Sequence, residues 1–348
     1  MILRTEKNQT YWVPIYSIND LSKNLLPLAI FEIFLHVFTG IMTVRCVIVL
    51  SRSRLVHFNM SLIICTFWCQ WAEAFIGKMI IIQFQYGFLT LNDLNRGYYS
   101  WWSFIDSNIL KVTNLQSLTI IYIYSLLQWH YIYTMLIGIG GVMVERGFAT
   151  FYINDYEKRS RLHIPLFVII VTHMISMPLS WFSTYTEINL VCSFTILFTT
   201  MIIMFLLYCV VLRSNIRLKS MMEKTSNNHL YSLAQKFQVK ENLRSLNMIR
   251  KFVIIIFFYV VFAGLILLTL ILGWTPEIGL SHVFENMITL NPFFLSSALM
   301  YCSPTWHNKY WSFLPYRKCC VIPEVENLKL NFDEEANVYF GQLKKAWI

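Results

Sequence analysis

The sequence predicts an all-α membrane protein, a bundle of seven transmembrane helices with its N-terminus extracellular and its C-terminus cytoplasmic. Two observations lead to this prediction. Hydrophobic residues make up 56% of the 348 residues and charged residues only 14%, whereas a water-soluble chain carries about 25% charged residues. The apolar residues are also gathered in seven blocks. Each block is close to or longer than the roughly 20 residues that cross the hydrocarbon of a bilayer.

We expect the seven spans at 25–50, 59–84, 109–144, 164–182, 190–212, 252–274 and 283–301. These runs are continuous, whereas the strands of an outer-membrane barrel alternate over about ten residues. The two shortest spans, the fourth and the seventh, contain prolines: Pro165 and Pro178 in the fourth and Pro292 in the seventh. A transmembrane helix tolerates proline where its neighbours satisfy the carbonyl that loses its partner, so both are kept as spans.

The basic residues set the predicted orientation. Segment 1–24 and every second connecting segment after it hold four Lys and Arg residues, whereas the alternate segments and the tail hold 20. Because short cytoplasmic loops carry the excess of Lys and Arg, we expect segment 1–24 outside, the seven-helix domain at 25–303, and the tail 304–348 inside. The net charge of +9 then belongs to an inner surface beside anionic membrane lipid, and no nucleic-acid partner is needed. Asn8, in the outer segment, begins an Asn-Gln-Thr sequon for N-glycosylation.

Few charged residues lie inside the apolar blocks, because each costs about 2.5 to 3.5 kcal/mol at the middle of a helix. Arg45 and Lys111 lie near span ends, where a long side chain reaches the lipid headgroups. Glu32, Glu73 and Lys78 lie deeper, and we interpret them as a polar network with Glu32 as the partner of either of the others. A transporter or ligand-gated channel is the alternative, with these three residues lining its pathway.

Two motifs are candidates for a conformational switch. Glu145 and Arg146 are adjacent at the cytoplasmic end of the long third span, before a basic loop. Such a pair can be closed in one state and open in another, although a simple interfacial anchor has the same pattern. Asn291 and Pro292 in the last span offer a kink and an amide for hydrogen bonds within the bundle, or only a proline that the helix tolerates.

The segments after the fifth and seventh spans favour the inner membrane surface. Segment 213–251 has nine basic residues among spaced leucines, which predicts helical extensions that dock a protein or lie on lipid. The tail is aromatic and basic up to Cys319 and Cys320, which are candidate palmitoylation sites. The sequence contains no hydrolase, metalloprotease or phosphate-loop motif, and Cys65 and Cys69 lack further metal ligands nearby. We therefore expect no enzyme, no metal and no cofactor.

Several stretches together resemble one family. The seven spans, Glu145-Arg146 after the third and Asn291-Pro292 in the seventh are similar to those of a G-protein-coupled receptor. Over nearly its full length the chain resembles the nematode serpentine-receptor class epsilon chemoreceptors, through 12–16 (WVPIY), 128–133 (QWHYIY), 145–150 (ERGFAT), 155–158 (DYEK), 236–244 (KFQVKENLR), 291–292 (NP) and 339–343 (YFGQL).

This resemblance implies a chemosensory receptor in the plasma membrane of a sensory neuron, in its cilium. Such a receptor detects an external small molecule and signals to a heterotrimeric G protein. The resemblance also implies that the G protein faces Lys158, Arg159, Lys240 and Arg244 on the inner side. Gly147 replaces the aromatic residue that usually follows the arginine of such receptors, so the switch departs in detail from the common pattern.

Overall fold

The computed structural model describes residues 2–5, 8–14, 17–18, 26–53, 56–89, 98–99, 109–112, 115–153, 161–186, 188–224, 233–272 and 278–312. Of the residues singled out above, Lys158, Arg159, Cys319 and Cys320 lie outside these ranges. The described parts of the chain form nine helices and five short strands.

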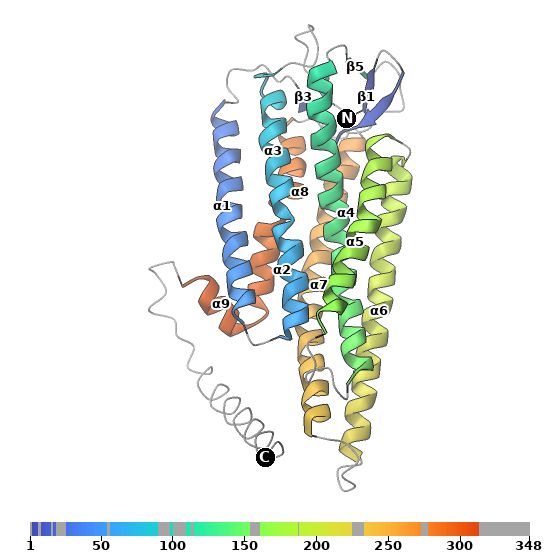
Figure 1. Ribbon diagram of the computed structural model, residues 1–348. Coiled ribbons are helices and arrows are strands. Elements are labelled where there is room, and N and C mark those ends of the chain that lie inside the picture. The colour runs from blue at the N-terminus through green and yellow to red at the C-terminus, as the bar shows by residue number, and fades with distance from the viewer. Residues whose placement is uncertain are drawn as a thin grey trace.

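The long helices run roughly along one axis and alternate in direction (Figure 1). Gln70, between the second and third helices, has helical dihedral angles (φ −59°, ψ −20°), so these two helices form one continuous span. The helices are α1 (Leu26–Ser51), α2 (Phe58–Cys69), α3 (Trp71–Gln85), α4 (Leu115–Phe151), α5 (His163–Thr184), α6 (Leu190–Lys224), α7 (Leu233–Ile271), α8 (Ile278–Tyr301) and α9 (Pro304–Tyr310).

The strands gather at the end of the bundle opposite α9 (Figure 1); we call these ends the strand end and the α9 end. β1 (Ile2–Thr5) lies between β2 (Thr10–Trp12) and β5 (Leu110–Val112), antiparallel to the first and parallel to the second. β3 (Ser17–Ile18) pairs antiparallel with β4 (Tyr98–Tyr99). The prediction that the third span begins at 109 is therefore wrong. The backbone of 110–112 pairs with β1 instead, and α4 begins at Leu115.

Six helical stretches of the described residues are long and apolar enough to cross a membrane: Leu26–Ser51, Phe58–Gln85, Leu118–Phe151, His163–Thr184, Val191–Lys224 and Gln238–Leu270. The seventh predicted span is α8, whose hydropathy is lowered by Glu285, Asn286 and Asn291. α8 packs against α1, α3 and α7, so it belongs to the same bundle. Its crossing of a membrane and the orientation of the termini stay predictions.

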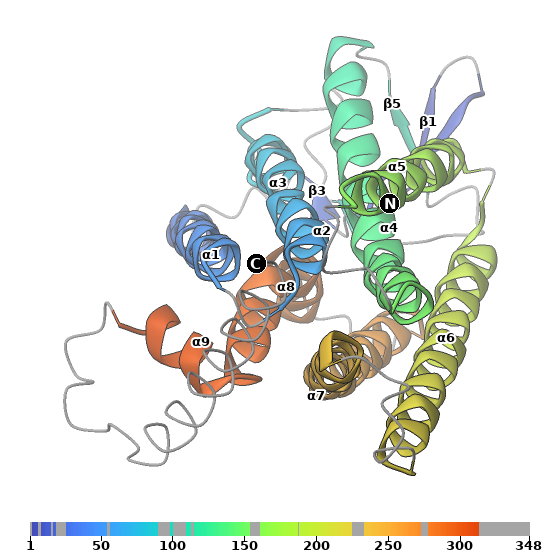
Figure 2. The ribbon, with the colours of Figure 1, turned by 60° about the horizontal axis from the view of Figure 1, so that its bottom comes forward.

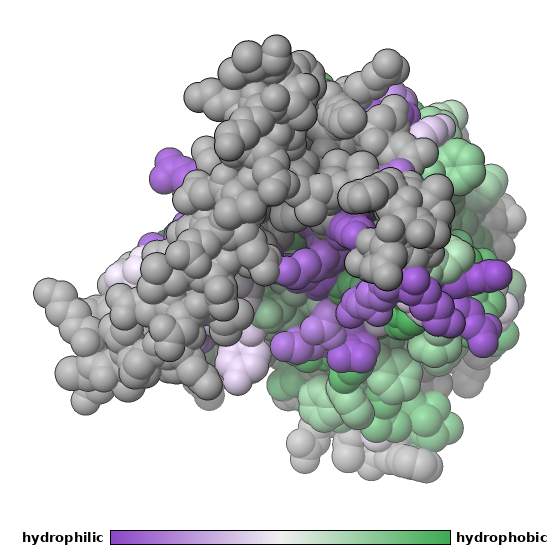
Figure 3. Space-filling view, turned by 90° about the horizontal axis from the view of Figure 1, so that it is seen from below, coloured by the Kyte–Doolittle hydropathy of each residue, from purple (hydrophilic) through white to green (hydrophobic). Residues whose placement is uncertain are grey.

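The outer faces of the helices are apolar. Phe34 on α1, Phe167 on α5, Phe205 on α6 and Phe258 on α7 are all exposed. Exposed apolar surface of this extent is unusual for a protein in water and suits contact with lipid. Seen from the α9 end, hydrophilic side chains gather over the helix ends and hydrophobic ones lie along the flank (Figure 3).

α4 is the central helix of the bundle and contacts α2, α3, α5, α6 and α7 (Figure 2). Glycines allow its closest approaches. A Cβ atom added at Gly141 would lie 2.6 Å from Cγ1 of Val168 on α5, and one at Gly138 would lie 2.7 Å from the Phe67 ring on α2. These close contacts hold α4 between α2 and α5. The expected helical extensions within 213–251 are present, because α6 continues to Lys224 and α7 begins at Leu233.

Candidate functional site

Glu145 and Arg146 form a closed, buried ion pair at the α9 end. Both side chains are 0% exposed, and the guanidinium donates from Nε and Nη2 to the two carboxylate oxygens of Glu145, each at 2.6 Å. A third donor, Nη1, reaches Oδ1 of Asn242 on α7 at 3.2 Å. A bidentate arginine–carboxylate pair is among the strongest charge-assisted contacts in proteins. The pair therefore links α4 to α7, and Asn242 is a partner that the sequence patterns did not reveal.

The surroundings of this pair hold the neighbouring helices as well. The Thr150 hydroxyl donates to the carbonyl of Arg146 at 2.8 Å and accepts from Nδ2 of Asn215 on α6 at 2.8 Å. His57 lies in the turn before α2, outside the apolar spans. Its burial and the positive charge of Arg146 lower its pKa from 6.5 to about 4. The arginine is thus surrounded by groups from α2, α6 and α7.

The Asn291-Pro292 motif lies where α8 meets α3, α4 and α7. The hydroxyl of Tyr131 on α4 donates to Oδ1 of Asn291. Carbonyls close to the proline have side-chain donors: Nε1 of Trp71 bonds the Thr289 carbonyl at 3.0 Å, and the Tyr259 hydroxyl bonds that of Met287 at 2.5 Å. Neighbouring helices are expected to satisfy backbone groups near a transmembrane proline in this way.

A second polar cluster lies among α1, α3 and α8, toward the strand end. The Lys78 ammonium is 3.2 Å from Oε2 of Glu32 and donates to Oε1 of Gln85 at 3.2 Å. The Gln85 amide in turn donates to Glu285, and Nδ2 of Asn286 donates to Glu32 at 2.6 Å. Four of these five side chains are buried. Lys78 is therefore linked to two carboxylates, directly to Glu32 and through Gln85 to Glu285, of which only Glu32 was expected from the sequence.

Glu73 contacts different residues. Its Oε2 is 2.7 Å from Nδ1 of His130 on α4, and Nε2 of that ring is 3.2 Å from Nδ1 of His173 on α5. The two imidazoles are stacked with their centres 5.3 Å apart. The single network expected for Glu32, Glu73 and Lys78 is therefore two clusters.

Four further predicted positions are described. Lys240 is exposed on α7 near the α9 end, and Arg244, one turn on, is half-buried. Asn8 is exposed and has a positive φ of 59° between β1 and β2. Arg45 does not simply reach toward headgroups as expected. Its guanidinium donates to the carbonyls of Tyr310 at 2.9 Å and Lys309 at 3.0 Å, and so binds the C-terminal turn of α9.

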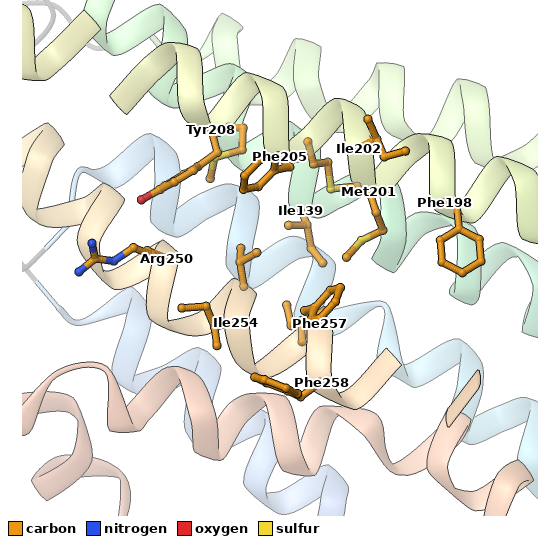
Figure 4. Close-up of a pocket in the computed structure, with 14 residues that line it drawn as sticks. Ile139, Phe198, Met201, Ile202, Phe205, Tyr208, Arg250, Ile254, Phe257 and Phe258 are labelled. Atoms are coloured by element: carbon orange, nitrogen blue, oxygen red, sulfur yellow. The ribbon is translucent and has the colours of Figure 1, made fainter. Parts of the chain in front are cut away.

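One large cavity, of about 740 Å³, opens between α4, α6 and α7. Figure 4 shows Tyr208 and Arg250 at one end of it and Phe198 at the other, with apolar side chains between them. Arg250 is exposed and also donates to Oδ1 of Asn247 on its own helix at 2.7 Å. The cavity lies between α6 and α7 beside Met143, which is one turn before Arg146 on α4.

Comparison with known proteins identifies the family of the chain. A family model described as Sre G protein-coupled chemoreceptor matches residues 1–348. Serpentine receptor class epsilon-38 of Caenorhabditis elegans is 32% identical over the whole of both chains. Class epsilon-37 of the same organism is 30% identical over 100% of this chain and 99% of its own. Class epsilon-27 is 25% identical over 97% and 96%. The chain therefore belongs to the Sre family of G protein-coupled chemoreceptors, and its apolar helices form a multi-pass membrane bundle.

Proposed function

We propose that this protein is a plasma-membrane receptor of a sensory cilium that detects an external small molecule and signals to a heterotrimeric G protein. In this proposal α8 is the seventh span, the strand end is extracellular and the α9 end is cytoplasmic. Family membership supports the receptor role. The 20 basic residues in the segments assigned to the cytoplasmic side support the orientation.

The closed Glu145–Arg146 pair is the observation that carries the signalling part of the proposal. Arg146 binds its neighbour Glu145 on α4 and also Asn242 on α7. It therefore joins two helices at the end of the bundle where a G protein would dock. Breaking the link to Asn242 frees α7 from α4, and the adjacent 740 Å³ cavity leaves apolar space into which the helices can repack. A ligand favours the open state only by the difference between its affinities for the two states.

The two motifs near the middle of the bundle supply a route from ligand to switch. Tyr131 joins α4 to Asn291 on α8. Both helices also pack against the N-terminal segment toward the strand end. A ligand bound among the outer halves of the spans would shift α8 against α4, and the shift would reach Arg146 along α4. Lys240 and Arg244 on α7, together with Lys158 and Arg159, would face the G protein.

The Arg146→Ala variant tests the proposal. Calcium imaging of cells that express the chain is screened against a panel of small molecules, and surface delivery is measured with an epitope tag at residue 1. We expect Arg146→Ala to lose the ligand-evoked signal while remaining at the surface. Arg52→Ala, which removes an exposed arginine just after α1, is the control and should keep the signal.

Two outcomes would refute parts of the proposal. A full ligand response from the Arg146→Ala variant would refute the role of the pair in coupling. Ligand-evoked current that persists when G proteins are blocked would instead indicate the channel or transporter alternative. If antibodies reach a tag at residue 1 only after the cells are permeabilised, the N-terminus is cytoplasmic and the proposed orientation is wrong.

A further inference from the structure

The indole of Trp12 occupies the interior of the bundle, although the residue belongs to the N-terminal segment. Trp12 ends β2 and is 0% exposed. It lies in one cluster of buried side chains from three helices: Trp129 and Tyr133 of α4, Ile266, Leu267 and Leu270 of α7, and Phe284 of α8. In the proposed receptor these helices surround the place where a ligand entering from outside would bind.

α4 binds Trp12 through side chains. The Ser125 hydroxyl donates to the Trp12 carbonyl at 2.8 Å, and Nε1 of Trp129, one turn further along α4, donates to the same oxygen at 3.1 Å. The two indole rings lie with their centres 4.5 Å apart and their planes inclined at 57°. α4 therefore packs an aromatic face against the indole and holds the backbone of Trp12 with two converging hydrogen-bond donors, so the shape and the face of the space that the ring occupies are those of a flat aromatic molecule.

Among the described residues, the buried side chains packed around this ring are mostly apolar. The members of this cluster are aliphatic or aromatic, and the Tyr133 hydroxyl already contacts Ser183 at 2.7 Å. The polar cluster of Lys78 and its carboxylates involves α1, α3 and α8 and includes no member of the Trp12 cluster. A charged molecule placed among these apolar side chains would lose much of its hydration, so we expect the site to favour neutral ligands.

We infer that this cluster is the ligand site of the receptor, that it takes a neutral, planar aromatic molecule of about indole size, and that Trp12 is a tethered occupant which the ligand displaces. The inference rests on the proposed receptor function for its biological meaning. The tether holds the indole at a high local concentration, so an external ligand binds only when it competes with Trp12. Residues 8 and 9, which join β1 to β2, are exposed, so the segment has room to move outward.

The first experiment empties the site. The full chain with Trp12→Ala is purified in detergent, and its melting temperature is measured against increasing 3-methylindole, which is the tryptophan side chain as a free molecule. We expect a saturable rise in this variant. Tryptamine, which adds an ammonium group to the same ring, should give none. Trp306→Ala is the matched control, because Trp306 is 1% exposed and lies in α9, so this variant empties an indole-sized space outside the proposed site. A rise of equal size in Trp306→Ala would mean that 3-methylindole fills any emptied indole cavity, and it would count against the inference.

The second experiment separates displacement from simple cavity filling, because it keeps Trp12. Ser125→Ala removes one hydrogen bond to the occupant, so 3-methylindole should bind this variant about fivefold more tightly than the wild type. Binding should also speed hydrogen exchange in residues 8–14 as the segment leaves. Ser180→Ala is the matched control. It removes a buried hydroxyl of α5 that bonds its own helix at 2.6 Å, and it should behave like the wild type.

Each outcome is decisive. A folded Trp12→Ala chain whose stability does not respond to 3-methylindole overturns the inference, as does exchange in residues 8–14 that stays unchanged in Ser125→Ala at saturating compound. If Trp12→Ala does not reach the cell surface, 3-methylindole added during expression should restore delivery, and no restoration also overturns it. None of these measurements uses signalling, so the ligand site and G-protein coupling fail independently.

Discussion

The buried ion pair between Lys78 and Glu32 allows a quantitative test of the bundle. Lys78 is 2% exposed, and its ammonium lies 3.2 Å from Glu32 and 3.2 Å from the Gln85 amide oxygen. Gln85 connects it to Glu285, which is 5% exposed. Lys78→Met keeps the length of the side chain and removes the charge. The substitution therefore leaves two carboxylates in the interior with no ammonium between them.

The expected cost follows from this burial. Removing one partner of a buried pair costs about 3–5 kcal/mol, because the remaining charge has lost its compensation. Removing both partners is often close to neutral for the same reason. We therefore expect Lys78→Met to lower the free energy of unfolding by several kcal/mol, and Glu32→Gln together with Lys78→Met to restore part of it, because the Glu285 carboxylate stays buried in the double variant. The interaction energy in this double-mutant cycle should exceed about 2 kcal/mol.

The assay is the unfolding of the purified chain in detergent, followed for the wild type, both single variants and the double variant. Lys219 and Glu223 on α6 are the control pair. They are 3.7 Å apart, four residues apart on one helix, and 58% and 67% exposed, so their coupling should be only about 0.3 kcal/mol. If the buried pair couples no more strongly than this surface pair, the reasoning about the buried network is wrong.

Three further predictions use the same preparation. Gly141→Ala should lower the free energy of unfolding by about 1–3 kcal/mol, because the added Cβ crowds α5. The Cβ of Gly264→Ala would meet nothing within 4 Å, so this variant should be neutral or stabilise α7 by up to about 1 kcal/mol. Equal effects of the two substitutions would contradict the close contact between α4 and α5. Tyr131→Phe should cost about 1 kcal/mol in the same unfolding assay, because it removes the hydroxyl donor of a half-buried amide oxygen on α8. A neutral result would argue against that bond. Because the folded-state pKa of His57 is about 4 and the unfolded value is 6.5, its contribution to stability is complete above pH 6.5 and is lost as the pH falls toward 4. His57→Gln should reduce this loss between pH 6.5 and 4, and an unchanged pH profile would contradict the buried neutral imidazole.

The sequence by itself determined the approximate position of the six helices that are long and apolar enough to cross a membrane. A run of apolar residues that is long enough to cross hydrocarbon has few alternatives to a helix, because the helix satisfies its backbone hydrogen bonds internally. The pairing of Glu145 with Arg146 was also accessible, since the two are neighbours along the chain and share the end of one helix. Such features depend on local composition and spacing.

Contacts between distant segments were decided only by the tertiary structure. Asn242 meets Arg146 across 96 residues, and Gln85 meets Glu285 across 200. Spacing along one helix indicates which residues share a face, but it does not indicate which helix packs against that face. The separation of Glu73 from Lys78 into different clusters follows from this limit, because the neighbours of each side chain depend on the packing of α1, α4, α5 and α8.

The N-terminal segment shows the same difference most clearly. Residues 2–5 and 10–12 form strands because β1 pairs with β5, more than 100 residues away in the chain. Nothing in the local pattern around Trp12 distinguishes an indole at a membrane surface from one buried between helices. Composition determines which segments can cross lipid as helices. The arrangement of α4, α7 and α8 determines that this indole lies inside the bundle, because the side chains that bury it come from three separate helices.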